Sequence, residues 1–275
     1  MKRSFAVVTD STADLPDEWR ERYDIEVVPL KVLFGQETFR DRIDMTDQQF
    51  FQRLAASTTL PTTSAPSPGE FAEVYRKLAE NHDGCISIHI GSQLSATAEA
   101  ARVGAQNVEG FPVEVIDSET VTMPMAFLCR VAAESSSLDE AVANVRERVP
   151  RCRVLALLDT LRYLEMGGRL SRTQAMIGTM LDLKPILQVK DREIKPVDRV
   201  RTKSRAIGRM VEFFKSEGPV EQVGVMHAQS PDEARDIAAR LSDGLGGAEI
   251  AMGQIGAVLG THVGPKAVGI VYIKK

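Results

Sequence analysis

The arrangement of apolar runs in the first half of the chain limits the fold more than any other feature. Four short runs, rich in β-branched and other apolar residues, end at polar residues and are separated by helical patterns: 5–8, 25–28, 85–90 and 113–116. Short buried strands that alternate with helices are typical of a mostly parallel sheet with helices on its faces. The first half of the chain is therefore predicted to be an α/β domain.

Two capping signals mark helices in this half. Residues 67–70 read Ser-Pro-Gly-Glu, a capping box with proline at the first helical position, and residues 137–140 form a second box. Apolar residues follow the first box at helical spacing: Phe71, Val74, Tyr75 and Leu78. Both segments are predicted to be amphipathic helices.

The second half of the chain has a different pattern. Strand-like runs at 185–189 and 193–197 flank Asp191-Arg192, which predicts a hairpin. Other strands and helices in this half follow no regular alternation, and such a mixture is typical of an α+β domain. We therefore predict an N-terminal α/β domain at residues 1–151 and a C-terminal α+β domain at residues 152–275.

Charge and apolar content narrow the class of partner. The formal net charge of −4 gives no global positive field that would attract nucleic acid or an anionic membrane. Residues 5–8 are too short for the apolar part of a signal peptide, and no apolar run approaches the ~18–20 residues that span a bilayer. Three widely spaced cysteines form no CxxC pair, which suits a reducing compartment. We expect a soluble, cytoplasmic protein without a nucleic-acid partner.

Metal and nucleotide motifs are missing from the sequence. The four histidines are scattered, without HxxxH or HExxH spacing, and neither GxxxxGK[ST] nor GxGxxG occurs. Asp10, Asp14 and Asp117 follow strands and are interpreted as turn formers rather than as an acid/base pair. The sequence therefore predicts no metal site and no bound cofactor.

Hydroxyl groups gather ahead of two predicted helices. The segment 61–69 is stiffened by prolines and places Thr63 near a helix N-terminus, where free N–H groups favour an anion. Ser92 and Ser95 follow the strand at 85–90 in the same way. This turn is similar to a nucleophile elbow, but Leu94 replaces the expected glycine. Each segment taken alone is better explained as a plain helix cap.

Two glycine-containing segments hold polar side chains that suit an anion. Arg169 follows a glycine pair, and a fixed arginine can clamp a carboxylate or phosphate. His262 lies between glycines in the segment 260–265 and can donate to an anion. The plainer alternatives are a surface arginine and a loop histidine whose hydrogen bonds are satisfied locally.

The ordered set of these motifs resembles the DegV family of bacterial fatty-acid-binding proteins over nearly the whole chain. The matching segments are Val-Thr-Asp-Ser-Thr-Ala-Asp-Leu-Pro at 8–16, Thr-Ser-Ala-Pro-Ser-Pro-Gly at 63–69, Ile-Ser-Ile-His at 86–89, Ile-Asp-Ser at 116–118, Tyr-Leu at 163–164 with Gly-Gly-Arg at 167–169, Leu-Lys-Pro-Ile at 183–186 and Gly-Thr-His-Val-Gly-Pro at 260–265. The sequence departs from the family pattern at Gly91, Ala96, Ala98 and Lys266.

The resemblance implies two α/β-type domains with one fatty acid between them, its carboxylate held by hydroxyls and its tail buried. Thr63 and Ser92 would bind the carboxylate, with Ser95 as a further candidate, and Arg169 and His262 would complete the polar network. Some members are the lipid-binding subunit of a bacterial fatty acid kinase, whose separate ATP-dependent subunit makes the acyl phosphate.

A basic stretch adds a candidate docking surface. Arg201 lies where the family has basic residues suited to docking the kinase subunit, although a solvated hairpin edge would look the same. We predict a carrier that presents a fatty acid and is not itself an enzyme. The alternatives are a serine-dependent acyl hydrolase or transferase, with Ser92 or Ser95 as nucleophile and His262 as base, and a lipid-sensing regulatory protein.

Overall fold

The computed structural model describes residues 3–170, 183–242, 245 and 249–275, and its first half is built on a four-stranded sheet. Its strands run parallel in the order β2-β1-β6-β7. They are β1 (Phe5–Asp10), β2 (Ile25–Val28), β6 (Gly84–His89) and β7 (Val113–Asp117). The accompanying helices are η1 (Ser11–Ala13), α1 (Asp17–Arg22), α3 (Pro68–Ala79), α4 (Thr97–Gln106), α5 (Met123–Glu134), α6 (Leu138–Arg148) and η2 (Val149–Arg151).

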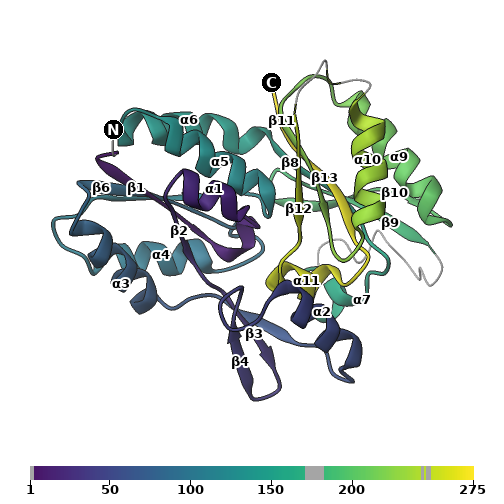
Figure 1. Cartoon of the computed structure of the whole chain (residues 1–275), viewed down its shortest axis with the longest axis horizontal. Helices are drawn as coiled ribbons and strands as arrows, with labels where there is room; N and C mark the ends of the chain where they lie inside the picture. Colours follow the sequence, from purple (N-terminus) through teal and green to yellow (C-terminus); the bar gives the residue numbers. More distant parts are fainter. Residues whose placement is uncertain (1–2, 171–182, 243–244, 246–248) are drawn as a thin grey trace.

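The two faces of this sheet are covered by different helices. α5 and α6 lie on one face, and α3 and α4 lie on the other (Figure 1). Alternation along β1 explains the division, since Phe5 and Val7 belong to the core on the α5 side, whereas Ala6 and Val8 pack with Phe71 of α3. The capping boxes predicted before α3 and α6 each bind a backbone amide of the helix. The predicted parallel α/β arrangement is confirmed.

A small antiparallel sheet is inserted between β2 and α3. Its order is β4-β3-β5, with β3 (Lys31–Phe34), β4 (Glu37–Arg40) and β5 (Thr62–Ser64), and helix α2 (Asp47–Ala56) packs beside it. The sequence analysis assigned no strand here. The importance of this sheet is that β5 carries Thr63, paired with Val32 of β3.

The second half forms a six-stranded mixed sheet in the order β10-β9-β8-β13-β11-β12. Its strands are β8 (Cys152–Leu157), β9 (Lys184–Lys190), β10 (Glu193–Val200), β11 (Val220–His227), β12 (Ile250–Gln254) and β13 (Val268–Lys274). Its helices are α7 (Arg162–Met166), α9 (Lys203–Ser216), α10 (Pro231–Ser242) and α11 (Ala257–Val263). The predicted hairpin is confirmed as β9–β10, and Asp191 and Arg192 both have positive φ, as a tight type I′ hairpin turn requires.

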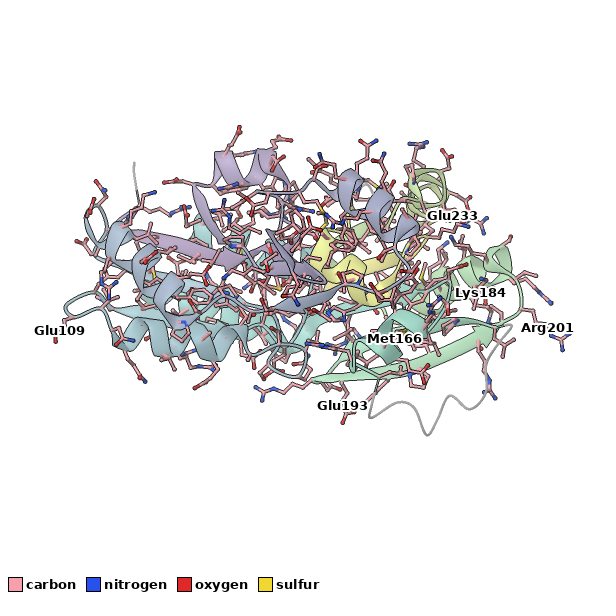
Figure 2. The ribbon with its side chains drawn as sticks, turned by 90° about the horizontal axis from the view of Figure 1, so that it is seen from below. Glu109, Met166, Lys184, Glu193, Arg201 and Glu233 are labelled. Atoms are coloured by element: carbon pink, nitrogen blue, oxygen red, sulfur yellow. The ribbon has the colours of Figure 1, made fainter. Side chains whose placement is uncertain are left out.

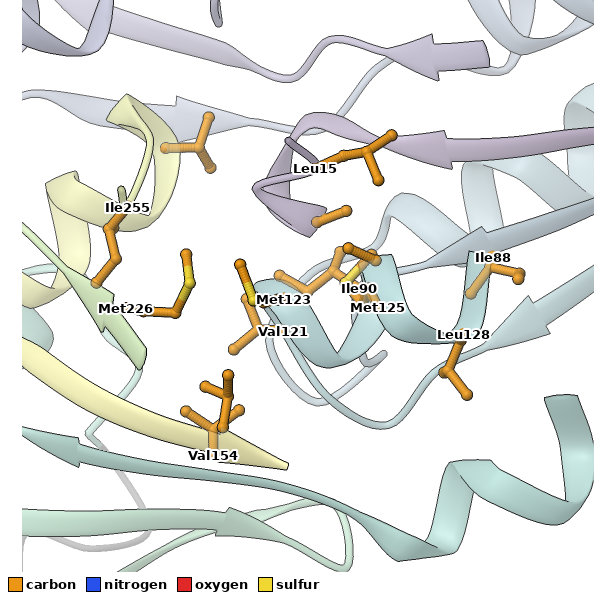
Figure 3. Packing of buried hydrophobic residues seen from close by; sticks show 14 of the residues in the cluster. Leu15, Ile88, Ile90, Val121, Met123, Met125, Leu128, Val154, Met226 and Ile255 are labelled. Carbon is orange, nitrogen blue, oxygen red and sulfur yellow. The ribbon is translucent and has the colours of Figure 1, made fainter. Parts of the chain in front are cut away.

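The six-stranded sheet separates two cores. Leu155 and Leu157 of β8 pack toward α9 and α10, whereas Val154 packs toward the first half of the chain. In Figure 3, Val154 and Met226 from this sheet point toward Met123, the first residue of α5, and toward Val121 in the loop before it. Both halves therefore contribute to one continuous core, and the division at residue 151 stays a prediction. Among the described helices, none is long and apolar enough to cross a bilayer.

Candidate functional site

A cavity lies where the two halves meet. It contains about 980 Å³ of space between atoms, a figure that includes open solvent at its mouth. Most of its lining is apolar, and the residues come from the inner face of the six-stranded sheet, from α11 and from the loops after β6 and β7, for example Ile90, Leu94, Val121, Leu187, Val189 and Val258.

Small residues in adjacent strands account for the hollow. Ala156 of β8 is directly paired with Gly269 of β13, and both line the cavity. Because strands alternate, their large neighbours Leu155 and Ile270 point to the opposite face of the sheet. The inner face of the sheet is therefore recessed at Ala156 and Gly269, and the residues around this recess are apolar.

Thr63 and His262 meet at the polar side of this cavity. The Thr63 hydroxyl lies 2.9 Å from Nε2 of His262, although the two residues are 199 positions apart in the chain. Two glycines allow α7 and α11 to approach: a Cβ on Gly167 would lie 2.4 Å from Nδ1 of His262, and one on Gly264 would lie 2.3 Å from the Tyr163 ring. The two glycine motifs seen in the sequence therefore meet each other here.

The environment keeps His262 neutral near pH 7. Burial, followed by the positive charge of Arg169, lowers the pKa of His262 to about 4. Its Nδ1 atom is buried and has no hydrogen-bond partner among the described residues. A neutral imidazole of this kind is a weak base, but it still carries one N–H donor.

Arg169 and Ser95 complete the polar side of the cavity. Arg169 is exposed, and its Nε donates to the carbonyl oxygen of Leu94 at 3.4 Å, which places the guanidinium beside the loop after β6. In the same loop, the Ser95 hydroxyl lies 2.8 Å from the Thr97 hydroxyl. Of the five ligand-binding residues predicted from the sequence, the structure thus brings four to one cavity: Thr63, Ser95, Arg169 and His262.

The structure does not bring Ser92 or Arg201 to this cavity. Ser92 is exposed and outside the lining, and its backbone amide donates to Oδ1 of Asp117 at 3.1 Å. Arg201 is exposed in the turn between β10 and α9, and in Figure 2 it points outward at one end of the molecule. The predicted role of Arg201 was docking, so a position outside the cavity is compatible with it.

Two polar residues of the cavity lining were not identified from the sequence. The Thr12 hydroxyl donates to Oδ1 of Asp10, and the Thr122 hydroxyl donates to Oδ2 of Asp14 at 2.7 Å. Thr12 lies within the motif at 8–16 and could have been found there. Thr122 has a φ of +60°, which no sequence signal indicates. Because both hydroxyls already donate to carboxylates, they can only accept from a ligand.

A serine, a histidine and an aspartate are also linked inside the parallel sheet. The Ser87 hydroxyl lies 2.7 Å from Nε2 of His89, whose Nδ1 lies 3.0 Å from Oδ2 of Asp10. All three side chains are fully buried, and the Tyr75 hydroxyl occupies the other side of Ser87 at 2.8 Å. This network holds strands and helix α3 together, and Ser87 and His89 are enclosed, so a substrate has no access to this serine.

The hydrolase alternative pairs Ser92 or Ser95 with His262, and neither serine is hydrogen-bonded to that histidine among the described residues. Nε2 of His262 is paired with Thr63, and the Ser95 hydroxyl with Thr97. Among the described residues, no group of three histidine, cysteine or acidic side chains could hold a metal ion.

The fold and the cavity define a class: an α/β protein with two main sheets, whose apolar cavity has one polar side. A family model described as "Uncharacterised protein, DegV family" matches residues 4–275, and the chain belongs to this family. A DegV domain-containing protein of Streptomyces coelicolor is 38% identical over 98% of this chain and 99% of that protein.

Solved structures agree with this assignment. DegV from Bacillus subtilis, described as a fatty acid binding protein, has a TM-score of 0.91 and 35% identity, with 100% of both chains covered. A stearic-acid-binding protein from Eubacterium ventriosum has a TM-score of 0.91 and 25% identity, with 98% of both chains covered. The predicted family and fold class are therefore confirmed.

Proposed function

We propose that this protein binds one long-chain fatty acid, with the tail in the apolar cavity and the carboxylate beside Thr63, Ser95, Arg169 and His262. The observation that carries the proposal is the combination of a mostly apolar lining with polar groups gathered on one side. The similar proteins described as binding fatty acids support the same ligand class.

The pair of Thr63 and His262 suits a carboxylate. In the tautomer with the proton on Nε2, neutral His262 donates to the Thr63 hydroxyl oxygen. The Thr63 hydroxyl hydrogen is then available for a carboxylate oxygen, and Arg169 supplies the positive charge at the exposed side. The histidine therefore orients the donor and does not need to be charged.

The energetics favour a long tail. Each buried methylene contributes about 0.8 kcal/mol, so a chain of about 14 methylenes offers on the order of 10 kcal/mol. Association and ordering offset a large part of this gain. A buried carboxylate without partners would cost several kcal/mol more, which is why the polar groups must lie at one end of the tail.

Mass spectrometry of solvent-extracted protein, purified from a bacterial host, tests the proposal directly. We expect a co-purifying fatty acid, and binding of added palmitate or oleate after its removal. Thr63→Val removes the hydroxyl without changing the shape of the side chain and should weaken binding about 10- to 100-fold. Thr62→Val, the exposed neighbour in the same strand, is the matched control and should bind normally. Protein that is free of lipid and also refuses added fatty acid contradicts the proposal.

We further propose that the protein is a cytoplasmic carrier that presents its ligand to a separate ATP-dependent kinase subunit, and that it does not catalyse the phosphorylation itself. Arg201 supports this idea because it is exposed and points outward at one end of the molecule, where it can meet an acidic surface. Arg201→Glu should reduce acyl phosphate formation with a bacterial fatty acid kinase subunit and leave lipid affinity unchanged. Lys215→Glu, an exposed charge near the other end of α9, is the control. A carrier that binds lipid but never supports acyl phosphate formation would instead be a lipid sensor.

A further inference from the structure

A second cavity, the acidic cleft, opens beside η1 and the end of β12. It is separate from the fatty-acid cavity, and no lining residue is shared between the two. Five carboxylates and two guanidinium groups line it: Asp10, Asp14, Asp17, Asp41, Asp47, Arg20 and Arg42. The carboxylates therefore outnumber the cations within the cleft.

Arg42 is already committed to two of these carboxylates. Its Nη2 atom donates to Oδ1 of Asp14 at 3.3 Å, to Oδ2 of Asp47 at 3.2 Å and to the carbonyl oxygen of Gln254 at 3.2 Å. One guanidinium thus serves Asp14 and Asp47 together. Asp41 forms no salt bridge within 4.0 Å of a cation among the described residues.

Asp41 is the least satisfied member of the cleft. The residue is 3% exposed, and neither carboxylate oxygen has a hydrogen-bond partner of normal geometry among the described residues. Ser11 and the amide of Ala257 lie near enough to favour the charged form, but burial dominates and raises the pKa of Asp41 to about 6. Oδ1 of Asp47 also has no partner among the described residues. Two residues of the cleft lining therefore hold three buried acceptor atoms whose hydrogen-bonding capacity is unused, which is costly for buried groups.

The rim of the cleft is apolar. Ile43 and Met252 are among the large hydrophobic side chains that the structure leaves exposed, at 57% and 42%, and both line the cleft. A ligand that fits must therefore combine a cationic group for the floor with apolar carbon atoms for the rim. Metal ions lack the second feature, and the described residues offer no group of three metal ligands.

We propose that the acidic cleft binds a primary alkylammonium group, with the ammonium at Asp41 and Asp47 and its methylenes against Ile43 and Met252. An ammonium carries three N–H donors, which match the three unused acceptor oxygens. The positive charge also compensates for the excess of carboxylates. This site is independent of the proposed fatty-acid function, because it shares no residue with that cavity.

Titration calorimetry of the full chain with 1,4-diaminobutane tests the proposal. We expect saturable binding that strengthens as pH rises from 6 to 8, because a bound cation favours the ionised forms of Asp14 and Asp41. Tetramethylammonium, which has no N–H donor, should not bind. This comparison uses the unaltered protein and does not depend on the folding of any variant.

Variants then locate the site. Asp41→Asn and Asp47→Asn should each weaken diamine binding at least about tenfold. Glu109→Gln, an exposed acid at one end of the molecule in Figure 2 and outside the cleft lining, should have no effect. A capped Ala-Lys-Ala peptide distinguishes two sources of the ammonium group. If the peptide binds more tightly than the diamine, the natural ligand is a lysine of a protein partner. If it binds more weakly, the natural ligand is a free amine. The proposal is overturned if neither probe binds, if tetramethylammonium binds equally well, or if folded Asp41→Asn binds as tightly as the unaltered chain.

Discussion

The two cavities of this protein use polar residues in opposite ways. In the fatty-acid cavity the floor is apolar, the histidine is neutral, and the positive charge of Arg169 lies at the exposed side. In the acidic cleft the charges form the floor and the exposed apolar residues form the rim. The first arrangement suits a long apolar molecule with an anionic end, and the second suits a cation on a short carbon chain.

Two aspartates connect the two cavities by hydrogen bonds. Asp10 lines the cleft and accepts from the hydroxyl of Thr12, which lines the fatty-acid cavity. Asp14 lines the cleft, and its Oδ2 accepts from Thr122, which lines the fatty-acid cavity. Its Oδ1 accepts from the amide of Gly256 at 2.9 Å, at the start of α11, the helix that carries His262. The comparison therefore predicts that changes in one cavity can be separated from changes in the other, except at Asp10 and Asp14.

The largest expected effect comes from filling the fatty-acid cavity at the recess formed by Ala156 and Gly269. Ala156→Phe places a ring where the tail should lie and displaces several methylenes, so fatty-acid affinity should fall about 100-fold or more. Diamine binding at the acidic cleft should not change. Fatty-acid and diamine titrations of one protein sample measure both effects, and equal losses at both sites would mean that the variant has disturbed the fold.

Leu155→Ala is the matched control on the opposite face of the same strand. Leu155 is fully buried against α9 and α10, so its truncation should lower the free energy of unfolding by about 2–5 kcal/mol. Fatty-acid affinity should stay within about twofold, because the methyl groups removed do not touch the cavity. Chemical denaturation and lipid titration of the variant test these two expectations. Loss of lipid binding in this variant would show that the two faces of the sheet are not independent.

The next effect concerns Asp14, which connects the cavities. Burial, opposed by Arg42 and by hydrogen bonds from Thr122 and Gly256, raises the pKa of Asp14 from 3.8 to about 7. Between these two values the folded state holds a proton that the unfolded state has lost, so this group's contribution to the free energy of unfolding falls as pH rises. From pH 5 to pH 8 the fall should be on the order of 3 kcal/mol.

Asp14→Asn should remove this pH dependence, because an amide does not ionise and can still pair with Thr122 and Gly256. Denaturation curves of both proteins at pH 5 and pH 8 give the difference. The variant should gain stability relative to the unaltered chain as pH rises. An unchanged difference at the two pH values would show that Asp14 is ionised throughout, and the cleft would then hold more negative charge than the structure indicates.

Much of this fold follows from the sequence, because strand and helix signals are local. The β9–β10 turn and the capping box at Ser67 depend on a few adjacent residues, and they formed as predicted. At Ser137 the serine caps the helix as predicted, but the Glu140 side chain accepts from Ser136 rather than from the Ser137 amide, so the second box is only half formed. The small sheet containing β5 was not predicted, because its three-residue strand gains its structure from pairing with Val32 and its neighbours. Local patterns do not carry that information.

The candidate site shows the same difference between features set by adjacent residues and features set by distant packing. Glycines indicated that Arg169 and His262 hold fixed positions, and the structure shows why, since Gly167 lets His262 approach. Lys266, where the sequence departs from the family pattern, has a φ of +62°. Glycine adopts this backbone conformation more readily than any residue with a side chain. The lining by Thr122 and the separation of Ser92 from the cavity depend on how distant loops pack, which spacing along the chain does not determine.

A smaller effect is expected at the exposed side of the fatty-acid cavity. Arg169→Ala removes a positive charge that solvent partly screens, so fatty-acid affinity should fall about tenfold at low salt. The difference between the two proteins should shrink as salt rises. Palmitate titrations at two salt concentrations measure it. A loss that is independent of salt would mean that Arg169 acts by holding the loop at Leu94 rather than by its charge.

The smallest effect separates two serines of one loop. Ser95 lines the fatty-acid cavity, and its hydroxyl already shares a hydrogen bond with Thr97, so Ser95→Ala should weaken fatty-acid binding only about threefold. Ser92 is exposed and interacts through its backbone amide, so Ser92→Ala should leave affinity within about twofold. Competition of both variants against the unaltered protein for one labelled fatty acid resolves differences of this size. A larger loss in Ser92→Ala than in Ser95→Ala would restore the role that the sequence predicts for Ser92, and would require the loop after β6 to turn toward the cavity when the ligand binds.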